Sequence, residues 1–238
     1  MYGLNAVAFV FFISINVLAY QLSKCSVLSR KKFVSVLSLT LLLLNIIRYV
    51  LVYPLIVGAI RIPVEFSAVS YFVVPTILLF ARNSVRSWAA YSGLMAGFFY
   101  YMAMILAGGP LYNAYPPYDI YISLFSHGTL YVCGLVTART EEYSYKDSPK
   151  LLLGVVLVAV WAMLLRPIVE GSESLLIYIL IDGVFVKQFL PQSSWNVMLP
   201  IYYVILIVLL LFTIKGFFKR NQKQYRKFSN CNAAAYEI

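Results

Sequence analysis

Four polar side chains recur at every fourth position of one predicted helix, and one of them is the only histidine of the chain. They are Asp119, Ser123, His127 and Tyr131, in an otherwise apolar stretch. On a helix this spacing makes a single polar stripe with a slow drift. Ionisable groups within a bilayer are costly and usually functional, and they face protein or water. The stripe predicts a polar pocket with Asp119 near its mouth and His127 about 10 Å below the outer surface, given the rise per residue of a helix.

The imidazole of His127 has the clearest capacity for chemistry. A histidine can act as a general base near neutral pH, provided that a nucleophile lies within hydrogen-bond reach. Ser123, one turn away, is a weak candidate for this nucleophile. Cys133 is a poor one, because it lies about 120° round the helix from His127. The alternative is a hydrogen-bonded histidine that only fixes helix packing. A single histidine with scattered cysteines and acidic residues makes no metal-ligand pattern, so we expect no metal and no cofactor.

A second ionisable residue, Arg48, lies within another predicted span at a depth that matches that of His127. An arginine there needs a carboxylate, backbone carbonyls or water. The carboxylates expected on the same side of the membrane are Glu65, Asp119, Glu170, Glu173 and Asp182. We favour Asp182, because it interrupts an apolar segment. Arg48 either lines a binding pocket or belongs to a buried ion pair that specifies helix arrangement without adding stability.

The composition identifies the elements that position these groups as membrane-spanning helices. Of the 238 residues, 62% are hydrophobic and only 12% are charged, which a soluble domain of this length could not accommodate. Uncharged apolar runs of about 18 or more residues indicate bilayer-spanning helices. We therefore predict an all-α, polytopic transmembrane bundle of about seven spans (six to seven). The predicted spans are Leu4–Tyr20, Phe33–Val57, Phe66–Phe80, Trp88–Ala107, Ile120–Ala138, Leu151–Leu165 and Met198–Phe218.

Three of the apolar segments are short. The third and sixth predicted spans are short for a hydrocarbon core of about 30 Å. A further segment, Leu175–Val186, is interrupted by Asp182 and Gly183 and could span, re-enter or lie at the interface. The fourth span carries Ala89, Gly93 and Gly97 on one stripe, and such small residues let helices approach closely.

The basic residues predict the orientation. Of the 19 lysines and arginines, 15 fall in loops and a tail on one side of the predicted spans. The positive-inside rule then places the N-terminus outside and the C-terminus in the cytoplasm. We expect one transmembrane domain (residues 1–218) and a basic tail (219–238) on the anionic inner leaflet. The positive charge is thus a topology signal and does not indicate a nucleic-acid partner. The expected location is the plasma (cell) membrane.

One stretch also resembles a known family. Tyr121–Tyr131, which reads Tyr-Ile-Ser-Leu-Phe-Ser-His-Gly-Thr-Leu-Tyr, is similar to the Phe-Ile-Ser-His-Gly segment of the YwaF-like integral membrane family. Looser likenesses are the segments Tyr71–Leu79, Tyr91–Gly97 and Trp195–Tyr203. Members of this family are small multi-span proteins, thought to be related to a eukaryotic membrane acyltransferase that acts on ether phospholipids. The resemblance implies a multi-span fold and a role in lipid chemistry.

The chain departs from the family at the presumed nucleophile. The third span of the family typically carries Pro-x-His-x-Cys, and placing Pro75 on that proline puts Ile77 at the histidine and Leu79 at the cysteine. Leucine cannot be a nucleophile. Thr76 could substitute for the cysteine in principle, and a later Asn-Tyr pair of the family is changed to Asp182-Gly183.

These observations leave several functions open. The first is a divergent, non-acyltransferring YwaF-like protein that binds membrane lipids or a small amphiphile through Arg48 and His127, and the expected site is completed by Thr76, Asp119, Ser123, Tyr131 and Asp182. The second is a lipid acyl hydrolase or transferase that uses His127 with a hydroxyl of Thr76 or Ser123. The third is a small-solute transporter, and the fourth is an accessory subunit with a membrane-protein partner.

Overall fold

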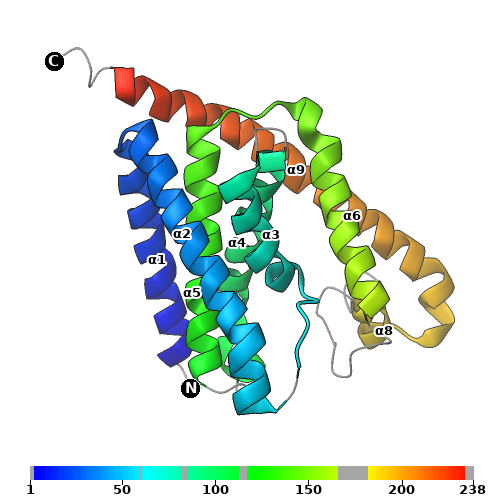
Figure 1. The fold of residues 1–238 in the computed structure, drawn as a ribbon. Coiled ribbons are helices and arrows are strands. Elements are labelled where there is room, and N and C mark those ends of the chain that lie inside the picture. The colour runs from blue at the N-terminus through cyan, green and yellow to red at the C-terminus, as the bar shows by residue number, and fades with distance from the viewer. Residues whose placement is uncertain (1–2, 59, 82–84, 113–116, 166–181, 234–238) are drawn as a thin grey trace.

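The computed structural model describes residues 3–58, 60–81, 85–112, 117–165 and 182–233, and most of these residues lie in helices (Figure 1). The all-α prediction is confirmed, since the described residues contain no strand. The residues 175–181 of the uncertain apolar segment lie outside the described part, and its end enters a short helix. In chain order the helices are α1 (Gly3–Lys24), α2 (Val27–Ile47), η1 (Arg48–Val57), α3 (Phe66–Phe80), α4 (Arg86–Tyr112), α5 (Pro117–Thr140), η3 (Tyr145–Asp147), α6 (Ser148–Leu165), α8 (Val184–Phe189), η4 (Gln192–Ser194) and α9 (Trp195–Ala233).

Six of the described helical segments are long and apolar enough to cross a membrane, as expected for a multi-pass membrane protein. The remaining predicted span, the third in the chain, is the shorter helix α3, whose 15 residues coincide with the predicted segment. At about 1.5 Å per residue α3 covers only about 22 Å. The guanidinium of Arg86 donates to the carbonyl of Leu78 at 2.8 Å and so provides a partner for a backbone acceptor at the C-terminal end of α3.

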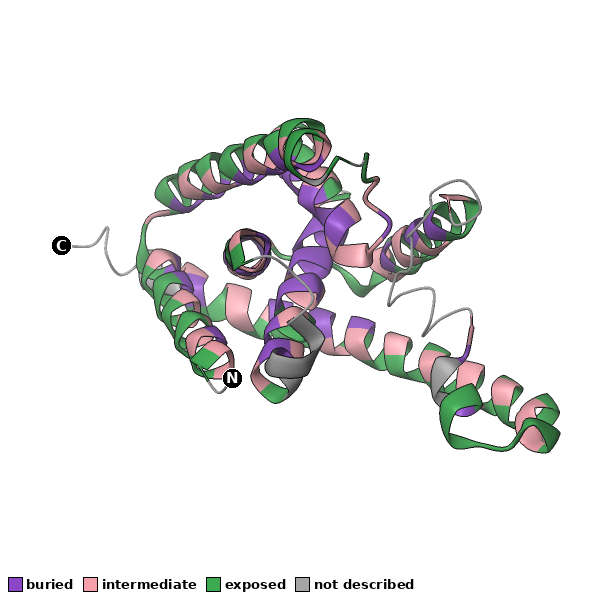
Figure 2. Cartoon of the chain, turned by 90° about the horizontal axis from the view of Figure 1, so that it is seen from below, coloured by how far each residue is buried: buried purple, intermediate pink, exposed green. Residues whose placement is uncertain are grey.

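Helix α5 forms the centre of the bundle, where it contacts α1, α2 and α4 (Figure 1). Within an apolar stretch of 18 residues of α5, 67% of the residues are buried inside the bundle, compared with 6% within the corresponding stretch of α9. Figure 2 shows buried residues gathered in the middle of the bundle and exposed ones along its periphery. This distribution follows from the residue types: α5 carries the polar stripe, which must avoid lipid, whereas the apolar surfaces of α6 and α9 can face it.

Helices α4 and α5 approach each other closely along the small-residue stripe, as its spacing predicts. A Cβ on Gly93 would meet the carbonyl oxygen of Leu130 at 2.7 Å, and a Cβ on Gly97 would meet that of His127 at the same distance. Gly134 of α5 makes the reciprocal approach to the backbone of α4. The backbone segment that carries His127 is therefore held directly against α4.

Replacing Gly97 with alanine should lower the free energy of unfolding by about 1–3 kcal/mol, because the added methyl overpacks against backbone atoms that cannot move alone. The matched control is Gly216→Ala in α9, where nothing lies within 4 Å of the position of the new methyl. That change should be neutral or stabilising through helix propensity. Thermal unfolding in detergent would compare the two, and equal unfolding temperatures would contradict the close approach of α4 and α5.

The two ends of the bundle carry different connections. The inner end carries the connection between α1 and α2, and it is the end predicted to face the cytoplasm. The outer end carries the start of α1 and the start of α5 (Figure 1). Helix α9 does not stop at the boundary predicted after Phe218, because the following Lys, Arg and Gln residues are good helix formers. It continues to Ala233 as one helix of 39 residues.

Candidate functional site

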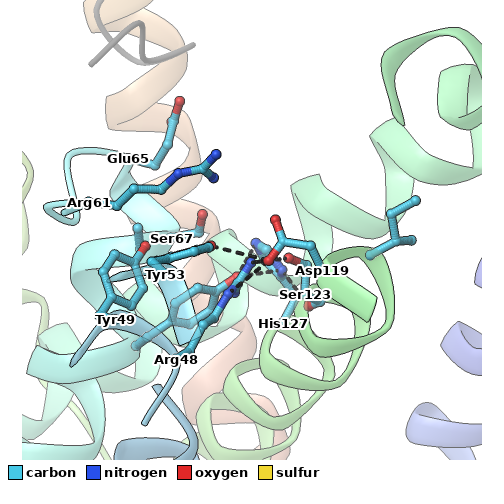
Figure 3. A pocket seen from close by; sticks show the side chains of 12 residues that line it. Arg48, Tyr49, Tyr53, Arg61, Glu65, Ser67, Asp119, Ser123 and His127 are labelled. Atoms are coloured by element: carbon cyan, nitrogen blue, oxygen red, sulfur yellow. Dashed lines mark hydrogen bonds and ion pairs between the residues drawn. The ribbon is translucent and has the colours of Figure 1, made fainter. Parts of the chain in front are cut away.

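A polar cavity of about 190 Å³ lies toward the outer end, between η1, α3 and α5. Figure 3 shows side chains from these elements converging on it. The lining residues include basic, acidic, hydroxyl and aromatic side chains. They are Arg48, Tyr49, Tyr53, Arg61, Glu65, Ser67, Ala68, Tyr71, Asp119, Ile120, Ser123 and His127.

A change of helix type positions one wall of this cavity. Helix α2 passes without interruption into the π-helical segment η1, which contains Pro54 and ends at Gly58 in the left-handed conformation (φ 71°). A π-helix places side chains at a different angular spacing from an α-helix and occurs frequently at functional sites. In η1 the side chains of Arg48, Tyr49 and Tyr53 all line the cavity.

The ion pair between Arg48 and Asp119 is the centre of a hydrogen-bond network that lines the cavity. Nε and Nη2 of Arg48 donate to Oδ1 of Asp119 at 3.1 and 2.6 Å, and Nη2 also donates to Ser123 Oγ at 3.0 Å. The phenol of Tyr53 donates to the same Oδ1 at 3.2 Å. Both charged residues are buried, at 5% and 6% exposure. The pair thus gives each charge the compensation that burial demands.

The mouth of the cavity carries a second set of charged residues. Arg61 is exposed and its guanidinium lies 4.6 Å from the centre of the Tyr53 ring. Arg48 lies 5.3 Å from the centre of the same ring, so two cations lie close to Tyr53. Glu65, on the rim beside α3, is half-buried. A polar molecule that enters would meet both signs of charge before it reached the buried ion pair.

His127 lies at the inner limit of the cavity and is surrounded by tyrosines. Its ring stacks on that of Tyr100, with centroids 3.5 Å apart and an angle of 8° between the planes. Nδ1 lies 2.8 Å from the carbonyl oxygen of Ser123, which can only accept, so Nδ1 carries a proton. The hydroxyl of Tyr71 lies 2.8 Å from Nδ1 and 3.1 Å from Nε2, and in the neutral ring Nε2 is then the nitrogen that can accept from it. Hydrogen bonds with Ser123 and Tyr71 orient the imidazole, and the ring of Tyr100 packs on one of its faces.

Comparisons with protein-family models, with curated proteins and with solved structures found no match. What the site can do therefore follows from its own residues.

The structure brings four of the predicted site residues together. Arg48, Asp119, Ser123 and His127 all line the cavity. The carboxylate that pairs with Arg48 is Asp119 and not Asp182, which the interrupted apolar segment favoured. Asp182 instead precedes α8, beside the first turns of α9, where the neighbouring Gly183 lies against Leu199.

Two other predicted residues lie outside the cavity. Thr76 is exposed, and its hydroxyl donates to the carbonyl of Phe72 in the preceding turn of α3. Tyr131 donates to Asn16 of α1 at 3.0 Å. Tyr131 lies outside the cavity because the stripe drifts round the helix: over the twelve residues from Asp119 to Tyr131, an α-helix rotates the side chain by about 120°.

The most important residues that the sequence analysis missed are Tyr53, Tyr71 and Tyr100. Each touches Asp119 or His127, yet each lies in a run of aromatic and aliphatic residues without distinctive spacing. Tyr53 has one usable signal, since it follows Arg48 by five residues, which is the hydrogen-bond spacing of a π-helix. That spacing is informative only once the helix is known to be a π-helix, and the sequence does not predict this helix type.

The only side-chain hydroxyl that is hydrogen-bonded to His127 among the described residues is that of Tyr71. The partners of the histidine are this hydroxyl and a backbone carbonyl, whereas the hydroxyl of Ser123 is held by Arg48. Cys133, the buried thiol of the same helix, lies 3.9 Å from the hydroxyl of Ser38. The arrangement can orient a polar group through hydrogen bonds and charge, and among the described residues no serine, threonine or cysteine side chain is hydrogen-bonded to the ring of His127.

Proposed function

We propose that the chain is a multi-pass membrane protein that binds the polar group of a lipid or small amphiphile in the cavity around Arg48 and His127. The observation that carries this proposal is the cavity itself: buried, mutually compensated charges line a space of about 190 Å³ between apolar helices. Charged residues within membrane segments usually mark a binding site or pathway. The proposed setting is the plasma membrane, with the cavity opening toward the outside.

The volume and the surroundings favour the polar part of an amphiphile over a whole lipid. A cavity of about 150 Å³ accommodates a molecule the size of benzene, so this one suits a headgroup-sized moiety. The helices that form the cavity are apolar, and η1, which supplies three of the lining residues, also carries exposed aliphatic side chains such as Leu51 and Leu55. Acyl chains could extend along such surfaces while the polar group occupies the cavity.

A binding role fits the geometry better than an enzymatic or a transport role. An acyl hydrolase or transferase needs a hydroxyl next to His127, and the described partners of His127 offer only that of Tyr71. A transporter needs a path toward the inner end, whereas the cavity lining on α5 reaches no deeper than His127 among the described residues. The YwaF-like resemblance remains part of the proposal, as a divergent member in which Leu79 replaces the nucleophile.

Lipid retained after purification in mild detergent tests the proposal. Native mass spectrometry should detect bound lipid in the wild-type protein and at least about tenfold less in the His127→Ala and Arg48→Ala variants, since a single charged or bidentate contact is worth a factor of this order. Thr76→Ala is the matched control, because Thr76 lies on α3 but outside the cavity, and it should retain lipid as the wild type does.

Circular dichroism should accompany each measurement, so that loss of lipid is counted only in folded protein. Equal lipid retention in wild type, His127→Ala and Arg48→Ala would refute the proposal. Loss in Thr76→Ala as well would mean that the lipid is held elsewhere on the surface of the bundle.

A further inference from the structure

The last part of α9 is an amphipathic strap that closes the inner end of the bundle. Residues 213–229, called the strap below, bury Ile214, Phe217, Phe218, Asn221 and Phe228 against the other helices. These positions follow the spacing of one helix face. All six basic residues of the strap are exposed, and they are Lys215, Lys219, Arg220, Lys223, Arg226 and Lys227.

Specific contacts hold the buried face in place. Asn221 donates to the carbonyls of Ala138 and Glu141 at 2.6 and 2.9 Å and accepts from the backbone N–H of Tyr143 at 2.8 Å. Burial raises the pKa of Tyr143 well above its ordinary range, so its phenol stays protonated and donates to Glu141 at 2.9 Å. Near its other end, the strap packs the ring of Phe228 against Tyr20 of α1.

The charge around the strap is strongly one-sided. Further exposed lysines at the inner end are Lys24, Lys31, Lys32 and Lys146. The acidic residues described nearby are largely occupied, because Glu141 pairs with Arg86 at 2.9 Å and Asp147 pairs with Lys150 at 2.6 Å. Glu142 is the exposed exception. The strap therefore presents a basic surface with little internal neutralisation.

We propose that the strap docks on the anionic lipid surface of the inner leaflet by charge alone, without inserting its aromatic side chains. Membrane-surface helices usually bury an apolar face among the acyl chains. Here Phe217, Phe218 and Phe228 are already packed inside the protein, so insertion would require the strap to leave the bundle. The face of the strap that is free to contact the membrane is therefore the basic one, and anionic headgroups complement its charge. This inference does not depend on the proposed function of the cavity.

Hydrogen exchange of the full-length protein in lipid nanodiscs tests the docking. Amides of the strap exchange through local opening, and docking should oppose that opening. Phosphatidylglycerol mixed into phosphatidylcholine should slow exchange in residues 213–229 about tenfold at low salt, since each basic residue near an anionic surface contributes about fivefold in affinity. At about 1 M salt, where the Debye length is only about 3 Å, the difference should disappear.

Two matched variants separate charge from side-chain identity. Lys219→Gln with Lys223→Gln removes two exposed charges and should leave less than about twofold protection by anionic lipid. Lys219→Arg with Lys223→Arg keeps both charges and should behave as the wild type. Both pairs alter exposed positions, so the fold should be retained.

Three outcomes would overturn the proposal. Equal exchange of the wild type in the two lipid mixtures would exclude docking on anionic lipid. Protection that persists in about 1 M salt and in the glutamine variant would indicate insertion of apolar side chains. Protection by added poly-glutamate but not by phosphatidylglycerol would assign the surface to an acidic protein partner instead of a membrane.

Discussion

Replacing Asp119 with alanine should lower the free energy of unfolding by about 3–5 kcal/mol, because it leaves Arg48 as a buried cation without its carboxylate. Arg48 is 5% exposed, and Oδ1 of Asp119 accepts from both its Nε and its Nη2. Ser123 is a neutral acceptor and cannot replace the lost charge. Unfolding in mixed micelles, followed by circular dichroism, would measure the loss.

The matched control removes both charges at once. Arg48→Met with Asp119→Leu replaces the pair with apolar side chains of similar size, a change that is often neutral or stabilising. This double variant should unfold within about 1 kcal/mol of the wild type and still retain no lipid, which separates the stability of the fold from binding in the cavity. An Asp119→Ala protein as stable as the wild type would instead mean that water in the cavity already solvates Arg48.

The proximity of Arg48 and His127 was predictable because depth in a membrane is a coordinate that the sequence supplies. Counting residues from the predicted surface places both groups at one level, and a polar stripe must face the interior of the bundle. The choice of carboxylate was not predictable in the same way. Asp119 and Asp182 are both expected near the outer surface, and only the packing of α2 against α5 decides between them.

The positions of the tyrosines around the site illustrate a second limit. Tyr71 and Tyr100 lie on α3 and α4, and their hydrogen bond and ring stacking with His127 depend on how these helices are rotated about their axes. Aromatic residues are common in this chain, which contains 20 tyrosines, so residue type alone selects none of them. The glycines were a better guide, because a small-residue stripe has a single geometric consequence.

The basic residues show both the strength and the limit of counting charges. Their distribution predicts the orientation of the helices in the membrane. Arg30 contributes to that count as a loop residue, yet its side chain is 1% exposed. Hydropathy and charge patterns describe an average environment for each residue, and they do not show which of several neighbouring basic residues turns inward.

Replacing Arg30 with alanine should therefore cost far more than its place in a basic loop suggests. Its guanidinium donates to three backbone carbonyls, those of Cys25 at 2.9 Å, Arg139 at 3.1 Å and Phe228 at 3.2 Å. These acceptors join the ends of α1 and α5 to the strap of α9. Hydrogen bonds from a charged donor are worth about 1.5–3 kcal/mol each, so we expect the free energy of unfolding to fall by about 3 kcal/mol or more.

The neighbouring Lys31 supplies a matched control for this effect. Lys31→Ala removes the same charge one residue along, but from an exposed position, and should change stability by less than about 0.5 kcal/mol. Arg30→Lys should fall between the two, because one ammonium group cannot reproduce the planar fork that reaches three acceptors. Hydrogen exchange in the strap should accelerate in Arg30→Ala and not in Lys31→Ala. If both alanine variants unfold alike, Arg30 acts only as a topology charge, and the strap is held by Asn221 and its phenylalanines alone.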